Sequence, residues 1–122
     1  MHRRLLLLPL TLLAFSGCGS SEEDAVRDVV KNYTKAFSER DAKTVCKLLV
    51  PKAQMIFQVV GQDCETAMAQ SLKKTPDSTL RAAGAIRIAS IRITGSRAVA
   101  EYKDRGGSNK LQKIDGRWGV EP

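Results

Sequence analysis

The feature that most constrains the fold of this chain is a change in the spacing of its apolar residues near Gly84. Before it, apolar side chains recur every three or four residues, as on one helical face, beginning with Val26, Val29, Val30, Tyr33 and Phe37. After it, isoleucines occupy first even and then odd positions: Ile86, Ile88, Ile91 and Ile93. Alternation that shifts once by one residue predicts a strand with a bulge near Ala89 and Ser90. Helices followed by strands indicate an α+β domain, with the helices packed on one face of a curved antiparallel sheet.

The helical half divides at residues that begin or end helices. Ser20 and Glu23 form a capping box at the start of the first helix. Asp41 and Asp63 are suitable N-caps for two further helices, and between them Pro51 can begin another. The helical spacing after the proline places three apolar side chains on one side: Ile56, Phe57 and Val60.

The second half is expected to form a meander of about four strands. Residues 77–84 precede it as a linker or a single helical turn. Asp115-Gly116 is a two-residue hairpin signal, and two other glycine-containing turns divide the rest. The expected strands are residues 86–93, 97–103, 110–114 and 117–120.

The N-terminus has the pattern of an export signal. Arg3 and Arg4 precede an apolar run that is too short to span a bilayer. Ser16 and Gly17 before Cys18 resemble the bacterial lipoprotein signal, which implies that Cys18 carries acyl chains such as palmitate. The expected parts are a signal peptide, a lipidated tether and one domain: residues 1–17, 18–21 and 22–122. The domain should lie at the extracytoplasmic face of the membrane, unless this is an ordinary secretory signal cut nearby.

Two cysteines remain in the domain, Cys46 and Cys64. An even pair in an exported domain most simply forms a disulfide. The alternative is a metal site with two thiolates, but its other ligands are missing because the only histidine, His2, leaves with the signal peptide. We therefore expect no metal, no cofactor and no histidine-based catalysis.

Four short phrases and the order of elements carry a family resemblance. The phrases are residues 38–43 (SERDAK), 46–49 (CKLL), 63–65 (DCE) and 114–118 (IDGRW). The chain resembles the nuclear-transport-factor-2-like superfamily, and within it the small lipoproteins of high-GC Gram-positive bacteria. The resemblance implies that the two cysteines pair and that the sheet curls around a space closed by helices. Members use that space as a catalytic pocket, a binding pocket or core, so the fold alone does not decide the function.

Five aromatic residues are candidates to line this space: Tyr33, Phe37, Phe57, Tyr102 and Trp118. They could bind a small apolar ligand, or they could fill the core of a small domain. An isomerase- or dehydratase-like enzyme would need Tyr33 and a carboxylate together in the space. Glu101 cannot join Tyr102 there, because neighbours in a strand face opposite sides. The prediction is a non-catalytic binding or accessory role.

Charge offers a third possibility. The chain has 20 Lys and Arg residues against 13 Asp and Glu residues, a net charge of +7. Four arginines of the strand region are candidates for a basic face: Arg87, Arg92, Arg97 and Arg117. Such a face could bind anionic lipid, a wall polymer or an envelope protein, or simply be solvated and prevent edge pairing. Nucleic acid is not expected, because no aromatic stacking platform accompanies the charge.

Overall fold

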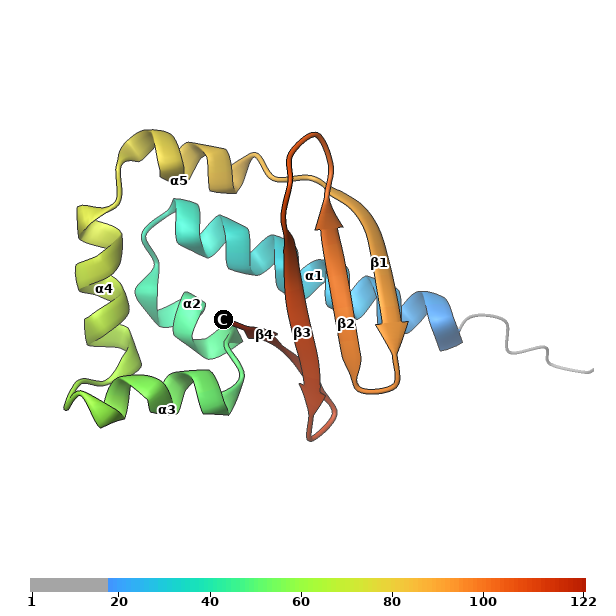
Figure 1. Cartoon of the computed structure of the whole chain (residues 1–122), viewed down its shortest axis with the longest axis horizontal. Helices are drawn as coiled ribbons and strands as arrows, with labels where there is room; N and C mark the ends of the chain where they lie inside the picture. Colours follow the sequence, from blue (N-terminus) through green and yellow to red (C-terminus); the bar gives the residue numbers. More distant parts are fainter. Residues whose placement is uncertain (1–17) are drawn as a thin grey trace, which may run out of the picture.

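The computed structural model describes residues 18–122, in which five helices precede a four-stranded sheet. The helices are α1 (Cys18–Ser38), α2 (Ala42–Leu48), α3 (Pro51–Val59), α4 (Cys64–Lys74) and α5 (Asp77–Gly84). The strands are β1 (Ile88–Thr94), β2 (Arg97–Tyr102), β3 (Ser108–Ile114) and β4 (Arg117–Glu121). The first helix lies across one face of the sheet, and the other helices continue beyond the sheet's edge (Figure 1). The predicted α+β class is confirmed; the predicted signal peptide, residues 1–17, lies outside the described residues.

Within residues 18–122, no helix combines the length and apolar character required to cross a bilayer.

The sheet is an antiparallel meander in the order β1-β2-β3-β4. The predicted bulge is present between Ile88 and Ser90. The bulge keeps the three isoleucines of β1 on the same face of the sheet. Each pairs with a residue of β2 that points to that face, in the pairs Ile88–Tyr102, Ile91–Ala100 and Ile93–Ala98. Asp115 and Gly116 have φ values of 51° and 78°, so the predicted tight hairpin between β3 and β4 is also confirmed.

The space between α1 and the sheet is filled by small and medium-sized apolar side chains. Val26 and Val30 of α1 are 0% and 1% exposed. They face a cluster of buried residues on β2, β3 and β4: Ala98, Ala100, Leu111, Trp118 and Val120. The middle of the fold is therefore filled core.

The first helix begins earlier than the sequence predicts. α1 starts at Cys18, so the four residues expected to form a tether, 18–21, are helical. These residues include no proline that would prevent the helix from continuing backward past the predicted cap at Ser20.

The prediction of a linker or single turn at residues 77–84 is wrong. These residues form the two-turn helix α5, which follows Pro76 as its N-cap residue. Leu80 is 2% exposed and packs with Ala42 and Leu72 in a second, smaller core cluster. Tertiary burial of this one leucine, together with contacts between α5 and α1, stabilises a helix too short to be stable alone.

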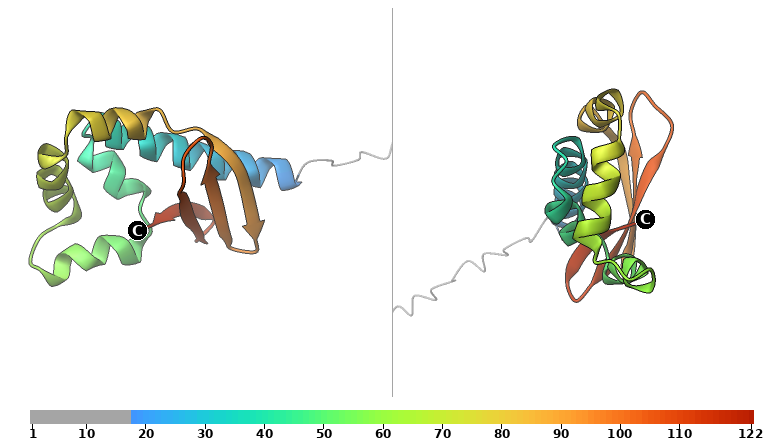
Figure 2. Two further views of the ribbon diagram at one scale, coloured as in Figure 1. Left: turned by 45° about the horizontal axis from the view of Figure 1, so that its top comes forward. Right: turned by 90° about the vertical axis from the view of Figure 1, so that its left-hand side faces the viewer.

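Helix α3 also differs from its prediction. Three apolar side chains were predicted to share one side of the helix, yet the core covers that side only in part, and Ala53 is the buried residue of α3. Phe57 packs against the main core, whereas Ile56 and Val60 are 56% and 72% exposed. The views in Figure 2 show α3 at one end of the molecule, beside the β3–β4 hairpin and away from α1.

A disulfide joins α2 to α4. Cys46 and Cys64 are bonded, with their Cα atoms 6.0 Å apart. Both residues are buried, and Cys64 is the first residue of α4, directly after its N-cap Asp63. The bond closes the segment that contains α3, so it holds this helix between two fixed points.

Candidate functional site

The five aromatic residues predicted to line one space are distributed over the fold. Tyr33 and Tyr102 lie at one end of the inner sheet face, and Trp118 lies on β4. Phe57 packs on the main core from α3. Phe37 belongs to the smaller cluster around Leu72 and Leu80. The structure therefore brings the two tyrosines together but not all five side chains.

The tyrosine end is a small polar cluster. The hydroxyl of Tyr102 donates a hydrogen bond to the amide oxygen of Asn109 on β3. Burial raises the pKa of the Tyr33 phenol. Burial and the neighbouring Tyr33 raise the pKa of Tyr102, while Arg105 opposes this shift. Both tyrosines are consequently neutral hydrogen-bond donors over the physiological pH range.

The carboxylates lie elsewhere. Over residues 21–122, no aspartate or glutamate is buried. Asp41 caps α2, as predicted, by accepting hydrogen bonds from the backbone N–H and the hydroxyl of Thr44. These bonds lower the pKa of Asp41. The partner of Tyr102 is thus an amide, which cannot act as a general base.

A cavity of about 210 Å³ opens at the other end, beside Trp118. One wall comes from the end of α2 and the start of α3: Leu49, Val50, Pro51 and Gln54. The opposite wall comes from β3 and β4: Gln112, Ile114, Trp118 and Gly119. Lys47, Asp115 and Arg117 complete the lining. We call this space the Trp118 cavity.

A second cavity, of about 320 Å³, adjoins the first. The two share Val50 and Gln112. From there the second cavity extends along α3 to Ile56 and across to Arg97 and Glu121. Together they form a groove between α3 and the strands that it faces.

The segment before α3 is held to β4 by the backbone. The N–H of Val50 donates to the carbonyl of Val120 over 3.0 Å, and Leu49 forms an isolated parallel bridge with the same residue. Gly119 makes this approach possible, because a Cβ there would lie 3.0 Å from Cγ1 of Val50 and 3.2 Å from its backbone. A glycine inside a strand often marks such a close approach, and this is the signal that could have located the cavity from the sequence.

Glu22 of α1 holds the indole ring of Trp118 in place. The indole N–H donates to one carboxylate oxygen over 2.8 Å, and the ammonium of Lys113 donates to the other over 2.7 Å. The same ammonium lies 5.9 Å from the centre of the indole ring. The bonds from Lys113 and Trp118 hold the pKa of Glu22 below its ordinary value. The orientation of the Trp118 ring is therefore set by the start of α1.

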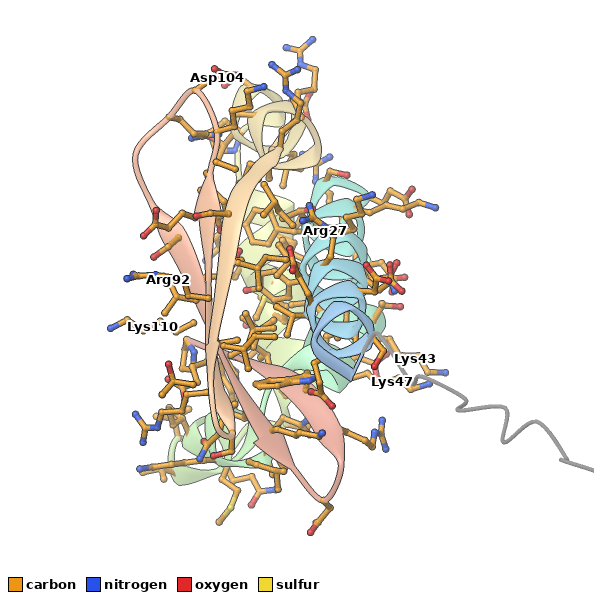
Figure 3. The ribbon with its side chains drawn as sticks, turned by 90° about the vertical axis from the view of Figure 1, so that its right-hand side faces the viewer. Arg27, Lys43, Lys47, Arg92, Asp104 and Lys110 are labelled. Carbon is orange, nitrogen blue, oxygen red and sulfur yellow. A yellow bond between two sulfur atoms is a disulfide. The ribbon has the colours of Figure 1, made fainter. Side chains whose placement is uncertain are left out.

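The four arginines predicted as one basic face have different surroundings. Arg87 pairs with Asp104 over 2.6 Å, and Arg92 pairs with Glu101 over 3.2 Å. Arg92 and Lys110 point away from the helices, from the uncovered face of the sheet (Figure 3). Arg97 and Arg117 line the two parts of the groove instead. Within the described residues no group of three or more potential metal ligands occurs.

A family model described as "putative lumazine-binding" matches residues 21–120, which is nearly all of the described chain. No curated protein and no solved structure matches the chain.

Proposed function

Because the chain belongs to this lumazine-binding family of the nuclear-transport-factor-2-like type, we propose that it binds a small planar heteroaromatic molecule in the Trp118 cavity. We further propose that it does so as a lipid-anchored domain outside the cytoplasmic membrane, in a non-catalytic role. The observation that carries the first proposal is a cavity of about 210 Å³ whose lining residues include Trp118, Gln54 and Gln112.

The chemistry of this cavity suits a lumazine-like ligand. Lumazine is a flat pair of fused rings whose edges carry N–H donors, ring nitrogens and carbonyl oxygens. Gln54 and Gln112 each offer an amide donor and an acceptor to such an edge. Leu49, Val50 and Ile114 supply the apolar surface that a ring needs. The amide nitrogen of Gln54 donates to the carbonyl of Leu49 over 3.1 Å, which limits its rotation and orders the site.

Titration calorimetry with lumazine tests the location of the site. The sample is the oxidised domain of residues 19–122, which contains both cysteines, all four strands and all but the first residue of the helices. Quenching of Trp118, the single tryptophan, gives a second readout. Gln112→Ala should weaken binding about fivefold, the value of one neutral hydrogen bond. Tyr102→Phe, at the opposite end of the fold, should leave the affinity unchanged.

Two results would contradict the proposed site. Wild-type protein that gives neither heat nor quenching with lumazine excludes this ligand class. Weakening by Tyr102→Phe but not by Gln112→Ala would move the site to the tyrosine end.

The lipid anchor has a separate support and a separate test. Arg3 and Arg4, the short apolar run and Ser16-Gly17-Cys18 form the pattern of a processed lipoprotein signal. In a bacterial host, wild-type protein should incorporate an alkyne-labelled palmitate, and Cys18→Ala should not. Equal labelling of the two proteins would refute acylation at Cys18.

A further inference from the structure

Four large apolar side chains are exposed on or just after α3. Met55 is 60% exposed, Ile56 56%, Val59 88% and Val60 72%. They are the large apolar side chains that residues 21–122 leave most open to solvent. We call them the α3 patch. Leaving this much apolar surface in water is unfavourable, so a clustered patch marks a contact surface.

We propose that the α3 patch docks on the surface of an anionic lipid bilayer. This inference rests on the proposed anchoring in one respect only, since the anchor would keep the domain beside the membrane. The docking itself is a property of the folded domain and can be measured without the acyl chains.

The charges around the patch favour a membrane over other apolar partners. The segment 51–62 contains no acidic residue and one lysine, Lys52. Arg97 lines the same cavity as Ile56, on the sheet side of the helix. Glu121 lines that cavity too and offsets one of these two cations, and Asp63 follows the far end of the helix. One net positive side-chain charge therefore remains beside the first half of the helix. A helix with an exposed apolar side and adjacent cations is typical of segments that lie in the interface of anionic membranes.

The position of the chain's start is compatible with this contact. Trp118 touches Glu22, one turn from Cys18, and also lines the cavity beside Pro51 of α3. The first turns of α1 and α3 therefore flank the same side chain. If residues 18–21 unwind, they can reach about 13 Å. Unwinding would let an acylated Cys18 stay in the bilayer while the domain turns the α3 patch toward the same surface.

A second copy of the chain fits the patch less well. The helix has nine residues and is about 13 Å long, and its exposed side is about 10 Å wide. That strip is far smaller than the roughly 800 Å² that each partner buries in a standard stable interface. Shallow insertion into lipid has no such minimum area.

Vesicle sedimentation tests the proposal. The oxidised domain of residues 19–122 is mixed with vesicles of phosphatidylcholine alone or with phosphatidylglycerol. Binding should require the anionic lipid and fall with added salt. Val59→Asp removes an exposed apolar contact without disturbing the core and should lower the partition coefficient roughly tenfold. Asn32→Asp adds the same charge on exposed α1, away from the patch, and should bind like wild type.

The possible outcomes separate the alternatives. Equal binding of Val59→Asp and wild type, or absence of binding to either vesicle, would overturn the proposal. Sedimentation velocity that shows a wild-type dimer and a Val59→Asp monomer would assign the patch to a second copy instead. Loss of palmitate labelling at Cys18 would refute the anchor but leave the vesicle result intact, so the two failures are distinguishable.

Discussion

Replacing Gly119 by alanine tests the contact that forms one wall of the Trp118 cavity. The added Cβ would lie 3.0 Å from Cγ1 of Val50 and 3.2 Å from its Cα and N. The side chain of Val50 could rotate, but its backbone is held by the 3.0 Å bond to Val120. The segment before α3 must therefore move away from β4 to relieve the clash between the added Cβ and Val50. Overpacking of this kind costs about 1–3 kcal/mol, and a value of about 2 kcal/mol corresponds to a decrease in Tm of about 10 °C for a domain of this size.

Urea unfolding followed by Trp118 fluorescence measures this cost directly. The urea midpoint of Gly119→Ala should fall while the slope m stays constant, because the surface exposed on unfolding is unchanged. Gly106→Ala is the matched control, since a Cβ at Gly106 meets nothing within 4 Å and its φ is not in the left-handed region. The control should be neutral or slightly stabilising. Equal stability of the two variants would refute the close approach of Val50 to β4, and with it this wall of the cavity.

Three further predictions concern the elements that hold the site. Cys46→Ala should lower the free energy of unfolding by about 3 kcal/mol in oxidising buffer, and the difference from wild type should shrink with a reductant; no loss in oxidising buffer would contradict the disulfide. Leu111→Ala, at a residue 1% exposed, should cost about 2–5 kcal/mol in urea unfolding, and a cost below that range would mean that the space inside the sheet is not tightly packed. The folded-state pKa of Glu22 is lowered from 4.5 by Lys113 and Trp118, so its stabilising effect is present above that pH and lost as the pH falls through the lowered folded value. The advantage of wild type over Glu22→Gln should therefore decrease on acidification below about pH 4.5, and a constant difference would exclude the ionised carboxylate as its cause.

The features that could be predicted from the sequence are those encoded by near neighbours. Asp41 and Asp63 cap their helices because a short acidic side chain can reach the N–H three residues on. The hairpin at Asp115 and Gly116 follows from two residues that tolerate positive φ. The bulge in β1 was visible as a one-residue shift in the alternation of isoleucines. Each of these signals lies within a few residues of the structure that it specifies.

The candidate site could be predicted only in part. Trp118 was among the proposed pocket residues, and it does line a cavity. The other aromatic residues could not be assigned to one space, because helical spacing shows which residues of α1 share a face but not what lies opposite that face. The contact of Val50 with β4 was missed for the same reason, since it joins segments far apart in the chain.

The sequence by itself determined the α+β class, four of the five helices, the four strands, their turns and the pairing of the remaining cysteines, because apolar periods, caps and tight turns are local. Only the tertiary structure decided that the middle of the fold is filled, that a groove lies between α3 and the strands, that Glu22 fixes Trp118 and that α3 leaves an apolar side in solvent. The same apolar spacing in α1 and α3 leads to burial in one helix and exposure in the other. The physical reason is that burial depends on which surface a helix meets, and the periodicity of a segment contains no information about its distant neighbours.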